Sequence, residues 1–378
     1  MANARQRFQA NCARVKLLNF RKYDGVLSHL RNLRLHSPAD LLLPHLKWLT
    51  FKDVTDEMLV FLPMFLAGQL RTITLHSGLS SNSACAILSQ ITQLCPDIRH
   101  VRARCGLPND SVRQLSALPR LREIYFRSVD GWSNIETCFK SISLESQQLE
   151  VVKVTYQGYL HPPTVDSVLT SASVFTSMVV LGLSVASGVW SNPGSYDIQP
   201  LLQLSRLRSL TLGVSFNLLL KTAPLTEEHI PVLAQAWPKM VFLDIIRKAA
   251  PMLRASPENI YPTFTLQSLE AFATHFPRLR LLVIDLDTST PEELVPPAVQ
   301  RTGTITLGLA HNALERARWL SIAEYISNLY PKVCIARKED VDVEEEYMEQ
   351  WAGVLEAIPV FSRAREEAVK SYVARSRA

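Results

Sequence analysis

The sequence has few of the features that direct a chain into or across a membrane. No apolar run reaches the roughly 18 residues that a membrane-spanning helix needs. The first residues, MANARQRFQANCARVK, contain no apolar core of a secretory signal. The 6 cysteines include no CxxC pair. We therefore interpret them as reduced, mostly buried thiols of a cytoplasmic or nuclear protein.

Motifs that carry catalysis or hold a cofactor are also missing. The sequence contains no GxGxxG, GxxxxGK[ST], GxSxG or HExxH. Its 9 histidines are dispersed, and no pair has metal-ligand spacing beside a cysteine or carboxylate. One small acidic cluster, formed by Asp285, Asp287, Glu292 and Glu293, is either a cation site or a solvated loop. We expect a non-enzymatic protein without metal or cofactor; an enzyme built on the loops is the rival of a different class.

Charge of one sign does not dominate the chain. The 40 basic and 35 acidic residues leave a net charge of +5, too mild an excess to indicate nucleic-acid binding. Hydrophobic residues make up 47% and charged residues 20%, an ordinary globular balance. Glycine is scarce, with 13 residues against 22 prolines. The distribution of the prolines turns out to mark a repeat.

A short pattern recurs along the chain: apolar, two variable positions, apolar, one variable position, apolar. The clear copies are Leu30–Leu35, Leu46–Phe51, Leu70–Leu75, Ile98–Ala103, Leu121–Phe126, Leu149–Val154, Met178–Leu183, Leu207–Leu212, Met240–Ile245 and Leu279–Ile284. Weaker copies are Val15–Phe20, Ile305–Leu309 and Val333–Ala336. The last three positions of a copy alternate apolar, polar, apolar, which predicts a strand with one buried face.

Segments with helical spacing separate the copies, and a proline ends many of them. In Ser83–Leu94 the apolar residues Ile87, Leu88, Ile91 and Leu94 share one helix face. Proline disfavours the helical conformation of the preceding residue, so it stops the helix just before the next strand. We expect the apolar residue before it to fill the gap between layers. These steps are Leu43-Pro44, Cys95-Pro96, Leu118-Pro119, Trp237-Pro238, Phe276-Pro277 and Tyr330-Pro331.

One strand and one helix per unit, joined with constant handedness, predict parallel strands in chain order. Such units cannot bury their own apolar faces and stack into a solenoid. The pattern LxxLxL is that of leucine-rich repeats. We predict an α/β fold, an irregular leucine-rich-repeat horseshoe with parallel strands on the concave face and helices on the convex face.

The predicted organisation has three parts. Residues 1–20 form an N-terminal cap and the first strand, and residues 21–338 form the solenoid. Residues 339–378 form an acidic linker and a C-terminal helix. Seven acids and no base fall within 339–350, which is typical of a solvated segment. We expect Trp351, Leu355, Ile358 and Phe361 to cap the last repeat, with a separate partner-binding helix as the alternative.

Several segments resemble the fungal F-box proteins with C-terminal leucine-rich repeats, which are abundant in mushroom-forming fungi. RFQANCARVKLLNF at Arg7–Phe20 resembles the segment that follows the F-box. LLPHLKWLTF, LCPDIRHVRA, LPRLREIYF and TLQSLEAFATHFPRLRLLVIDLD resemble the helix-proline-strand repeats of that family. The resemblance covers roughly residues 5–338. It implies a substrate-binding module of a cullin-type ubiquitin ligase receptor.

The F-box itself is a helical module with a Leu-Pro start, and we find no such segment in this sequence. The resemblance therefore implies a Skp-type adaptor and a cullin as partners only if an F-box lies upstream. A free-standing leucine-rich-repeat scaffold without a ubiquitin role is the alternative. In both hypotheses the chain is a monomer that binds a target protein, with no nucleic acid or membrane as partner.

The variable positions on either side of the fourth residue of each copy are expected to point into the concavity, because side chains alternate across a strand. In the N-terminal half they form a basic and aromatic zone, a composition typical of interface hot spots. It could also hold an acidic peptide or phosphopeptide. The predicted binding residues of this zone are Arg34, Trp48, His100, Arg102, Arg104, Tyr125, Arg127 and Lys153.

A second zone is predicted in the C-terminal half, where apolar and acidic residues occupy the same positions. Its predicted binding residues are Phe242, Asp244, Leu281 and Val283. The alternative for both zones is an ordinary solvated strand face. The pattern does not decide which of the two zones binds the target.

Overall fold

The computed structural model describes most of the chain and divides it into two compact units, 1–188 and 189–378. The residues described are 2–21, 25–36, 42–52, 56–76, 80–107, 109–116, 118–128, 139–140, 148–156, 162–185, 195–213, 217–220, 223–245, 264–288, 294–309, 318–335 and 345–377. Residues 339–344 of the predicted acidic linker lie outside them, as do Glu292 and Glu293 of the predicted acidic cluster.

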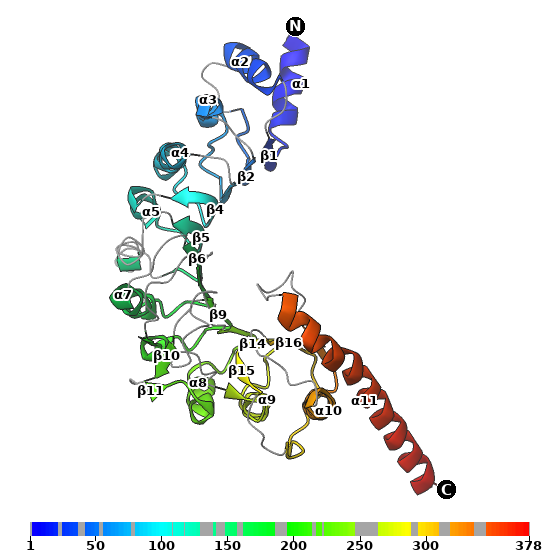
Figure 1. The fold of residues 1–378 in the computed structure, drawn as a ribbon. Coiled ribbons are helices and arrows are strands. Elements are labelled where there is room, and N and C mark those ends of the chain that lie inside the picture. The colour runs from blue at the N-terminus through cyan, green and yellow to red at the C-terminus, as the bar shows by residue number, and fades with distance from the viewer. Residues whose placement is uncertain are drawn as a thin grey trace. The chain divides into compact units, whose positions relative to one another are not determined.

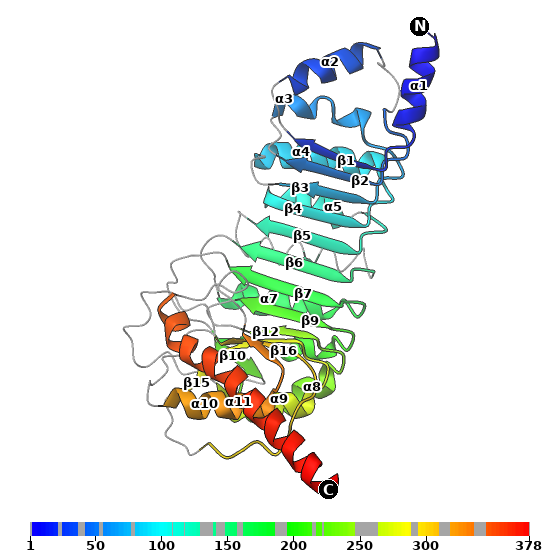
Figure 2. The ribbon, with the colours of Figure 1, turned by 90° about the vertical axis from the view of Figure 1, so that its right-hand side faces the viewer.

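The first unit alternates strands and helices along the chain. Its elements are α1 (Ala2–Cys12), β1 (Leu17–Arg21), α2 (Val26–His36), β2 (Trp48–Lys52), α3 (Asp56–Leu59), η1 (Leu62–Met64), β3 (Thr72–Leu75), α4 (Ser81–Leu94), β4 (His100–Leu107), α5 (Asn109–Ser116), β5 (Glu123–Ser128), β6 (Val151–Tyr156), α7 (Pro162–Ser173) and β7 (Val180–Val185). The strands β1 to β7 are neighbours in chain order, and every pair is parallel. Figure 2 shows them stacked one after another.

In the first unit α2, α3, α4, α5 and α7 lie on one side of the strands, and the other side of the sheet faces away from them (Figure 1). Alternation along each strand sends every second side chain toward the helices. In β2, for example, Leu49 and Phe51 are buried, whereas Trp48 is exposed. The apolar positions of the repeat thus form the core, and the variable positions between them form the opposite face.

The second unit contains the later repeats. Its elements are β8 (Ser195–Asp197), η2 (Gln199–Gln203), β9 (Ser209–Gly213), β10 (Asn217–Leu220), β11 (Ala223–Pro224), η3 (Glu227–His229), α8 (Ile230–Ala236), β12 (Phe242–Asp244), β13 (Phe264–Thr265), α9 (Ser268–His275), β14 (Leu281–Ile284), β15 (Leu286–Asp287), β16 (Ile305–Leu309), α10 (Trp319–Leu329), β17 (Val333–Ile335) and α11 (Glu345–Arg377). The strands β9, β12, β14, β16 and β17 pair in parallel and in chain order. Each unit is therefore an α/β solenoid of the leucine-rich-repeat type, as predicted.

The residue before each proline is buried, so the predicted filling of the gap between layers is confirmed. The exposed fractions of Leu43, Cys95, Leu118, Trp237, Phe276 and Tyr330 are 5%, 0%, 1%, 1%, 2% and 0%. Two of these residues also bond to the backbone of an earlier repeat. The indole Nε1 of Trp237 donates to the backbone oxygen of Leu201 at 3.0 Å. The hydroxyl of Tyr330 donates to the backbone oxygen of Leu269 at 2.9 Å. Trp237 and Tyr330 thus tie the ends of α8 and α10 to earlier repeats.

One predicted strand is wrong. Leu30–Leu35 lies inside α2, whereas the other twelve copies contain strands at or near the predicted positions. The spacing of Leu30 and Leu33 fits one turn of a helix as well as the repeat. The strand β1 pairs directly with β2, so the connecting segment supplies the helix of that repeat instead of a strand.

The long helix α11 packs against α10 in the second unit, and the two lie side by side in Figures 1 and 2. Trp351, Val354 and Ile358 are buried, with 2%, 0% and 5% of their surface exposed. The guanidinium of Arg365 donates to the backbone oxygen of Ser327 and, at 2.9 Å, to its hydroxyl. Beyond Arg365 the side chains described are exposed.

Two further findings concern the described residues as a set. No helix among them is long and apolar enough to cross a membrane. Nor do they contain a group of three or more His, Cys, Asp or Glu side chains that could hold a metal ion.

Candidate functional site

The sheet face of the first unit that points away from the helices is called here the open face. Strand register arranges its side chains in rows that run across the strands. The first row is Leu17, Trp48, Thr72, His100, Glu123 and Val151, and the second row is Asn19, Thr50, Thr74, Arg102, Tyr125 and Lys153. Most residues of the predicted basic and aromatic zone therefore lie together on one surface.

An apolar patch lies at the β1 end of the first row. Leu17 and Trp48 are register partners on adjacent strands, and 62% and 43% of their surfaces are exposed. Strands in a sheet are about 4.8 Å apart, so the two side chains lie next to each other. An exposed tryptophan beside an exposed leucine is costly in water. This pair is a feature of the open face that a partner could cover.

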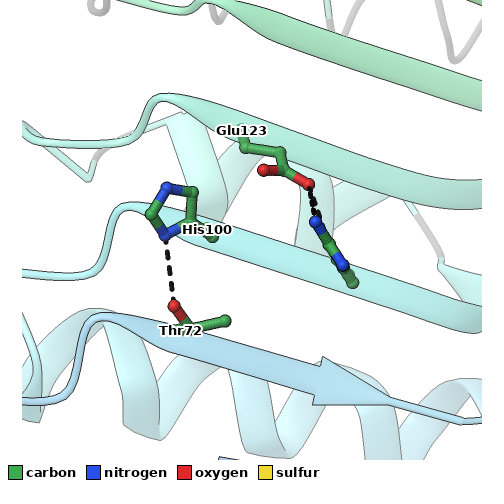
Figure 3. A network of polar contacts seen from close by, with 4 residues as sticks. Thr72, His100 and Glu123 are labelled. Carbon is green, nitrogen blue, oxygen red and sulfur yellow. Dashed lines mark hydrogen bonds and ion pairs between the residues drawn. The ribbon is translucent and has the colours of Figure 1, made fainter. Parts of the chain in front are cut away.

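A polar network occupies the middle of the open face (Figure 3). The Nη2 and Nε atoms of Arg102 lie 2.7 Å and 2.8 Å from Oε1 of Glu123 on the next strand. The Nδ1 atom of His100 is 3.1 Å from the hydroxyl of Thr72. The side chain of Arg102 is 56% exposed, so this ion pair adds little stability, about 0.2–1 kcal/mol. It leaves the remaining donors of the guanidinium directed toward solvent.

Burial and the neighbouring charges both act on the pKa of His100. Burial lowers the pKa of His100 below its ordinary value of 6.5, and Arg102, Arg99 and Arg122 lower it further, whereas Glu123 raises it. The influence of Arg99 and Arg122 also places their charges close to the open face.

The remaining predicted residues of the basic zone differ in exposure. Arg104 and Lys153 are exposed, and Tyr125 and Arg127 are half-buried. Arg104 lies in an irregularity of β4, because the register with β5 shifts between Ala103 and Gly106. The Nε atom of Arg127 is buried and has no hydrogen-bond partner among the residues that the structure describes. Arg127 is thus a cation beside the open face with unused donor capacity.

Arg34 does not belong to the open face. It lies in α2, where its Nη1 is 3.5 Å from the backbone oxygen of Val60 and its guanidinium lies 5.9 Å from the ring centroid of Phe61. Its predicted place on a strand is therefore wrong, for the same reason as the strand prediction for Leu30–Leu35.

A row of cations that the sequence reasoning missed lies directly before the strands. It consists of Lys16, Lys47, Arg71, Arg99 and Arg122 and is called here the strand-start row. Backbone hydrogen bonds of 2.8–3.0 Å connect its members. The nitrogen of Lys47 bonds the oxygen of Lys16 at 2.8 Å, and that of Arg71 bonds the oxygen of Lys47 at 3.0 Å. The nitrogens of Arg99 and Arg122 continue the series at 2.8 Å each. The sequence contained a signal for this row, because the second position of the repeat copy is basic in the five copies that contain β1 to β5.

The predicted zone of the C-terminal half is only partly accessible. Phe242 is 44% exposed, and Asp244 and Leu281 are half-buried. Val283 is fully buried and is the register partner of Gly308, so its predicted exposure is wrong. Phe242 and Leu281 are register partners on β12 and β14. The structure thus leaves this zone with fewer accessible groups than the open face of the first unit.

The comparisons with known proteins give similarity of fold only. No family model matches the chain, and no curated protein matches it. A solved structure from the Rad7 and Elc1 complex in yeast is similar, with 12% identity and a TM-score of 0.34 over 81% of this chain and 93% of that chain. Another, from the TLR13–ssRNA13 complex, has 14% identity and a TM-score of 0.33 over 83% of this chain and 39% of that chain. At these values the description of the fold rests on the strand register of each unit.

Proposed function

We propose that the chain is a protein-recognition module that holds a target protein on the open face of its first unit. The observation that carries this proposal is the exposure of Trp48 beside Leu17, on the same face as the exposed cations Arg102 and Lys153. Tryptophan and arginine are the residues that most often contribute large shares of binding energy in interfaces. The stability of the sheet does not require these side chains to be exposed.

The finer proposal is that the module is the substrate-binding part of an F-box-type ubiquitin ligase receptor. It is supported by the resemblance of the helix-proline-strand repeats to fungal F-box proteins with leucine-rich repeats. In this role the open face holds the target while a separate ligase performs the chemistry. A Skp-type adaptor and a cullin are then partners through an F-box upstream of these repeats. A free-standing scaffold, with the same open face but no ubiquitin role, is the alternative.

Affinity capture of the native protein from its own cells, with mass spectrometry of the co-purifying proteins, tests the function. Stoichiometric Skp-type adaptor and cullin would support the ligase receptor. Reproducible capture of other proteins without an adaptor would support the scaffold and contradict the ubiquitin role.

The surface is tested by capture with variants of the open face. We expect Trp48→Ala, and the double variant Arg102→Glu with Arg127→Glu, to lose the partner without unfolding. Truncating a hot-spot residue costs about 2 kcal/mol or more in binding, a loss of roughly thirtyfold. Val232→Ala on α8 is the control for Trp48→Ala, because Val232 is also exposed, at 44%, but lies outside the open face. Unchanged capture by both open-face variants would contradict the assignment of the surface.

A further inference from the structure

The strand-start row brings like charges together in a way that folding alone does not favour. Each member directly precedes the next strand of one parallel sheet, so the backbones of neighbours are about 4.8 Å apart along the row. The five cations thus fall within roughly 19 Å. Like charges directly opposite each other on adjacent strands destabilise a sheet. The arrangement therefore calls for negative charge from elsewhere.

The protein itself supplies little of that negative charge. Within the part of the chain that the structure describes, the one carboxylate in ion-pair contact with the row is Glu150, whose Oε1 is 3.4 Å from Nη1 of Arg122. Lys16 and Arg71 are exposed, and Lys47 and Arg99 are half-buried. Arg99 and Arg122 directly precede His100 and Glu123, which belong to the first row of the open face. Four of the five cations thus remain for an external anion.

The apolar patch formed by Leu17 and Trp48 lies at the β1 end of the strand-start row. Lys16 precedes Leu17, and Lys47 precedes Trp48, so two members of the row are sequence neighbours of the two exposed apolar residues. A partner that fits both features has negative charge next to an apolar side chain. An extended peptide segment with acidic residues and one large apolar residue has this chemistry. Such a segment rises about 3.3 Å per residue, so about six residues cover the row.

We propose that the strand-start row and the adjoining Leu17 and Trp48 bind an extended acidic segment of the target protein. Its carboxylates pair with the cations of the row, and an apolar side chain covers the patch. The proposal rests on the proposed recognition function and deepens it by naming the chemistry of the target.

The surroundings of the row favour an acidic protein segment over a nucleic acid. Glu150 at the end of the row and Glu123 beside it on the open face would repel a continuous chain of phosphates. A base stacks on aromatic rings, and of the two exposed apolar residues Trp48 has such a ring, whereas Leu17 beside it offers only an aliphatic surface. The chain as a whole carries a net charge of only +5. An acidic segment can place its charges at the row and leave the two glutamates uncontacted.

The experiment is selection from a phage-displayed library of random peptides about 12 residues long, roughly twice the length of the row. The bait is the full chain, and the selected peptides are then synthesised and their Kd measured by fluorescence anisotropy. The row variant carries Lys16→Glu, Lys47→Glu and Arg71→Glu. The matched control carries Arg206→Glu, Lys239→Glu and Arg278→Glu, which reverse three exposed cations in turns of the second unit. Both variants have the same net charge, and thermal melting checks that each is folded.

We expect the selected peptides to be enriched in Asp and Glu and to contain a large apolar residue. The row variant should weaken their binding about tenfold or more, because three charge pairs are reversed, and the control should leave it unchanged. Binding to the wild type should weaken as salt is added. If the row variant fails to fold, Lys47→Gln with Arg71→Gln replaces it, with the same direction expected.

Three results would overturn the inference. One is a selection without acidic enrichment; a second is equal binding by the row variant and the control. The third is tighter binding of an oligothymidylate of matched length than of the acidic peptides, which would indicate nucleic acid instead. Selected peptides that need Trp48 but ignore the row would leave the recognition function standing while removing the acidic target. Failure to select any peptide on the open face would count against both.

Discussion

His100 shows how single residues of the open face depend on charges from other strands. Its imidazole lies between the hydroxyl of Thr72 on β3 and the ion pair of Arg102 with Glu123. Burial and three arginines lower its pKa, and one glutamate opposes them. The unfolded chain therefore binds more protons than the folded one between the lowered pKa and 6.5. Stability from this group rises with pH through that window and is lost as the pH falls below it.

The residue-scale prediction uses two substitutions that move this pKa in opposite directions. Arg102→Gln removes a positive charge and leaves Glu123 without its partner, so the pKa of His100 should rise. Glu123→Gln removes the negative charge and leaves Arg102 without its partner, so the pKa should fall. A ¹H NMR titration of the imidazole Hε1 resonance, assigned with His100→Gln, measures both shifts. Shifts of the same sign in the two variants would contradict the described network.

Sequence reasoning reached this residue only as a variable position of a repeat copy. The alternation of β4 correctly placed His100 and Arg102 on the uncovered side of the sheet. Their contacts could not be predicted, because Thr72 and Glu123 lie 28 and 21 residues away in the chain. The strand register that joins them is a property of the packed solenoid.

At the scale of elements, the contact between β14 and β16 leaves no room for a side chain at Gly308. Gly308 is the register partner of Val283. A Cβ atom at Gly308 would lie 2.6 Å from Cγ1 and 3.0 Å from Cγ2 of Val283. Valine is stiff at its first side-chain torsion and cannot turn away freely. A side chain at this glycine would therefore push the two strands apart.

We expect Gly308→Ala to destabilise the second unit by about 1–3 kcal/mol, the usual cost of overpacking. Gly68→Ala is the control, because a Cβ there has no atom within 4 Å, and its effect should stay within about 0.5 kcal/mol. Urea denaturation followed by tryptophan fluorescence measures both. Combining Gly308→Ala with Val283→Ala removes the clash, so the double variant should cost less than the sum of the single ones. Additive costs would contradict the contact.

The proline steps are the elements that the sequence predicted best. A proline disfavours the helical conformation of the residue before it, and α4, α8, α9 and α10 each end just before such a step. The rule is not absolute, because Ile358-Pro359 lies inside α11. The helix α2 is the counterexample, since its leucines fit both a helix turn and a repeat copy. Only the pairing of β1 with β2 excludes a strand there. Local rules thus predict helix ends well where a proline restricts the backbone. They predict less well where the same leucines fit both the helical period and the repeat pattern.

At the scale of the whole molecule, an open solenoid exposes apolar surface at its last repeat unless another element packs there, and α11 packs against α10 in the second unit. Its first part buries Trp351, Val354 and Ile358, whereas residues 366–375 are exposed. Burying each large apolar side chain is worth about 1.5–3 kcal/mol. The two parts of one helix therefore differ in what they contribute to stability.

We expect deletion of residues 345–378 to lower the midpoint of thermal unfolding and to make the protein prone to aggregation, because the apolar surface of α10 becomes exposed. Deletion of residues 366–378 alone should leave the midpoint unchanged. Differential scanning calorimetry of the two truncated proteins and the full chain measures the difference. Equal midpoints for the full chain and the longer deletion would contradict the covering role of α11.

The sequence by itself determined the period of the repeat, the alternation of buried and exposed positions and the places where helices end. These properties depend on the backbone and on neighbouring residues, so they can be read locally. The residues that point away from the core in β2, β4 and β5, including Trp48 and Arg102, followed from the same alternation.

Only the tertiary structure decided which of those residues meet. Strand register aligned Lys16, Lys47, Arg71, Arg99 and Arg122 into one row, although they are spread over more than a hundred residues of sequence. It also buried Val283 against Gly308 and placed Arg34 on a helix. The physical reason is that register and burial arise from packing between units. Residues distant in sequence become neighbours only when the whole sheet forms.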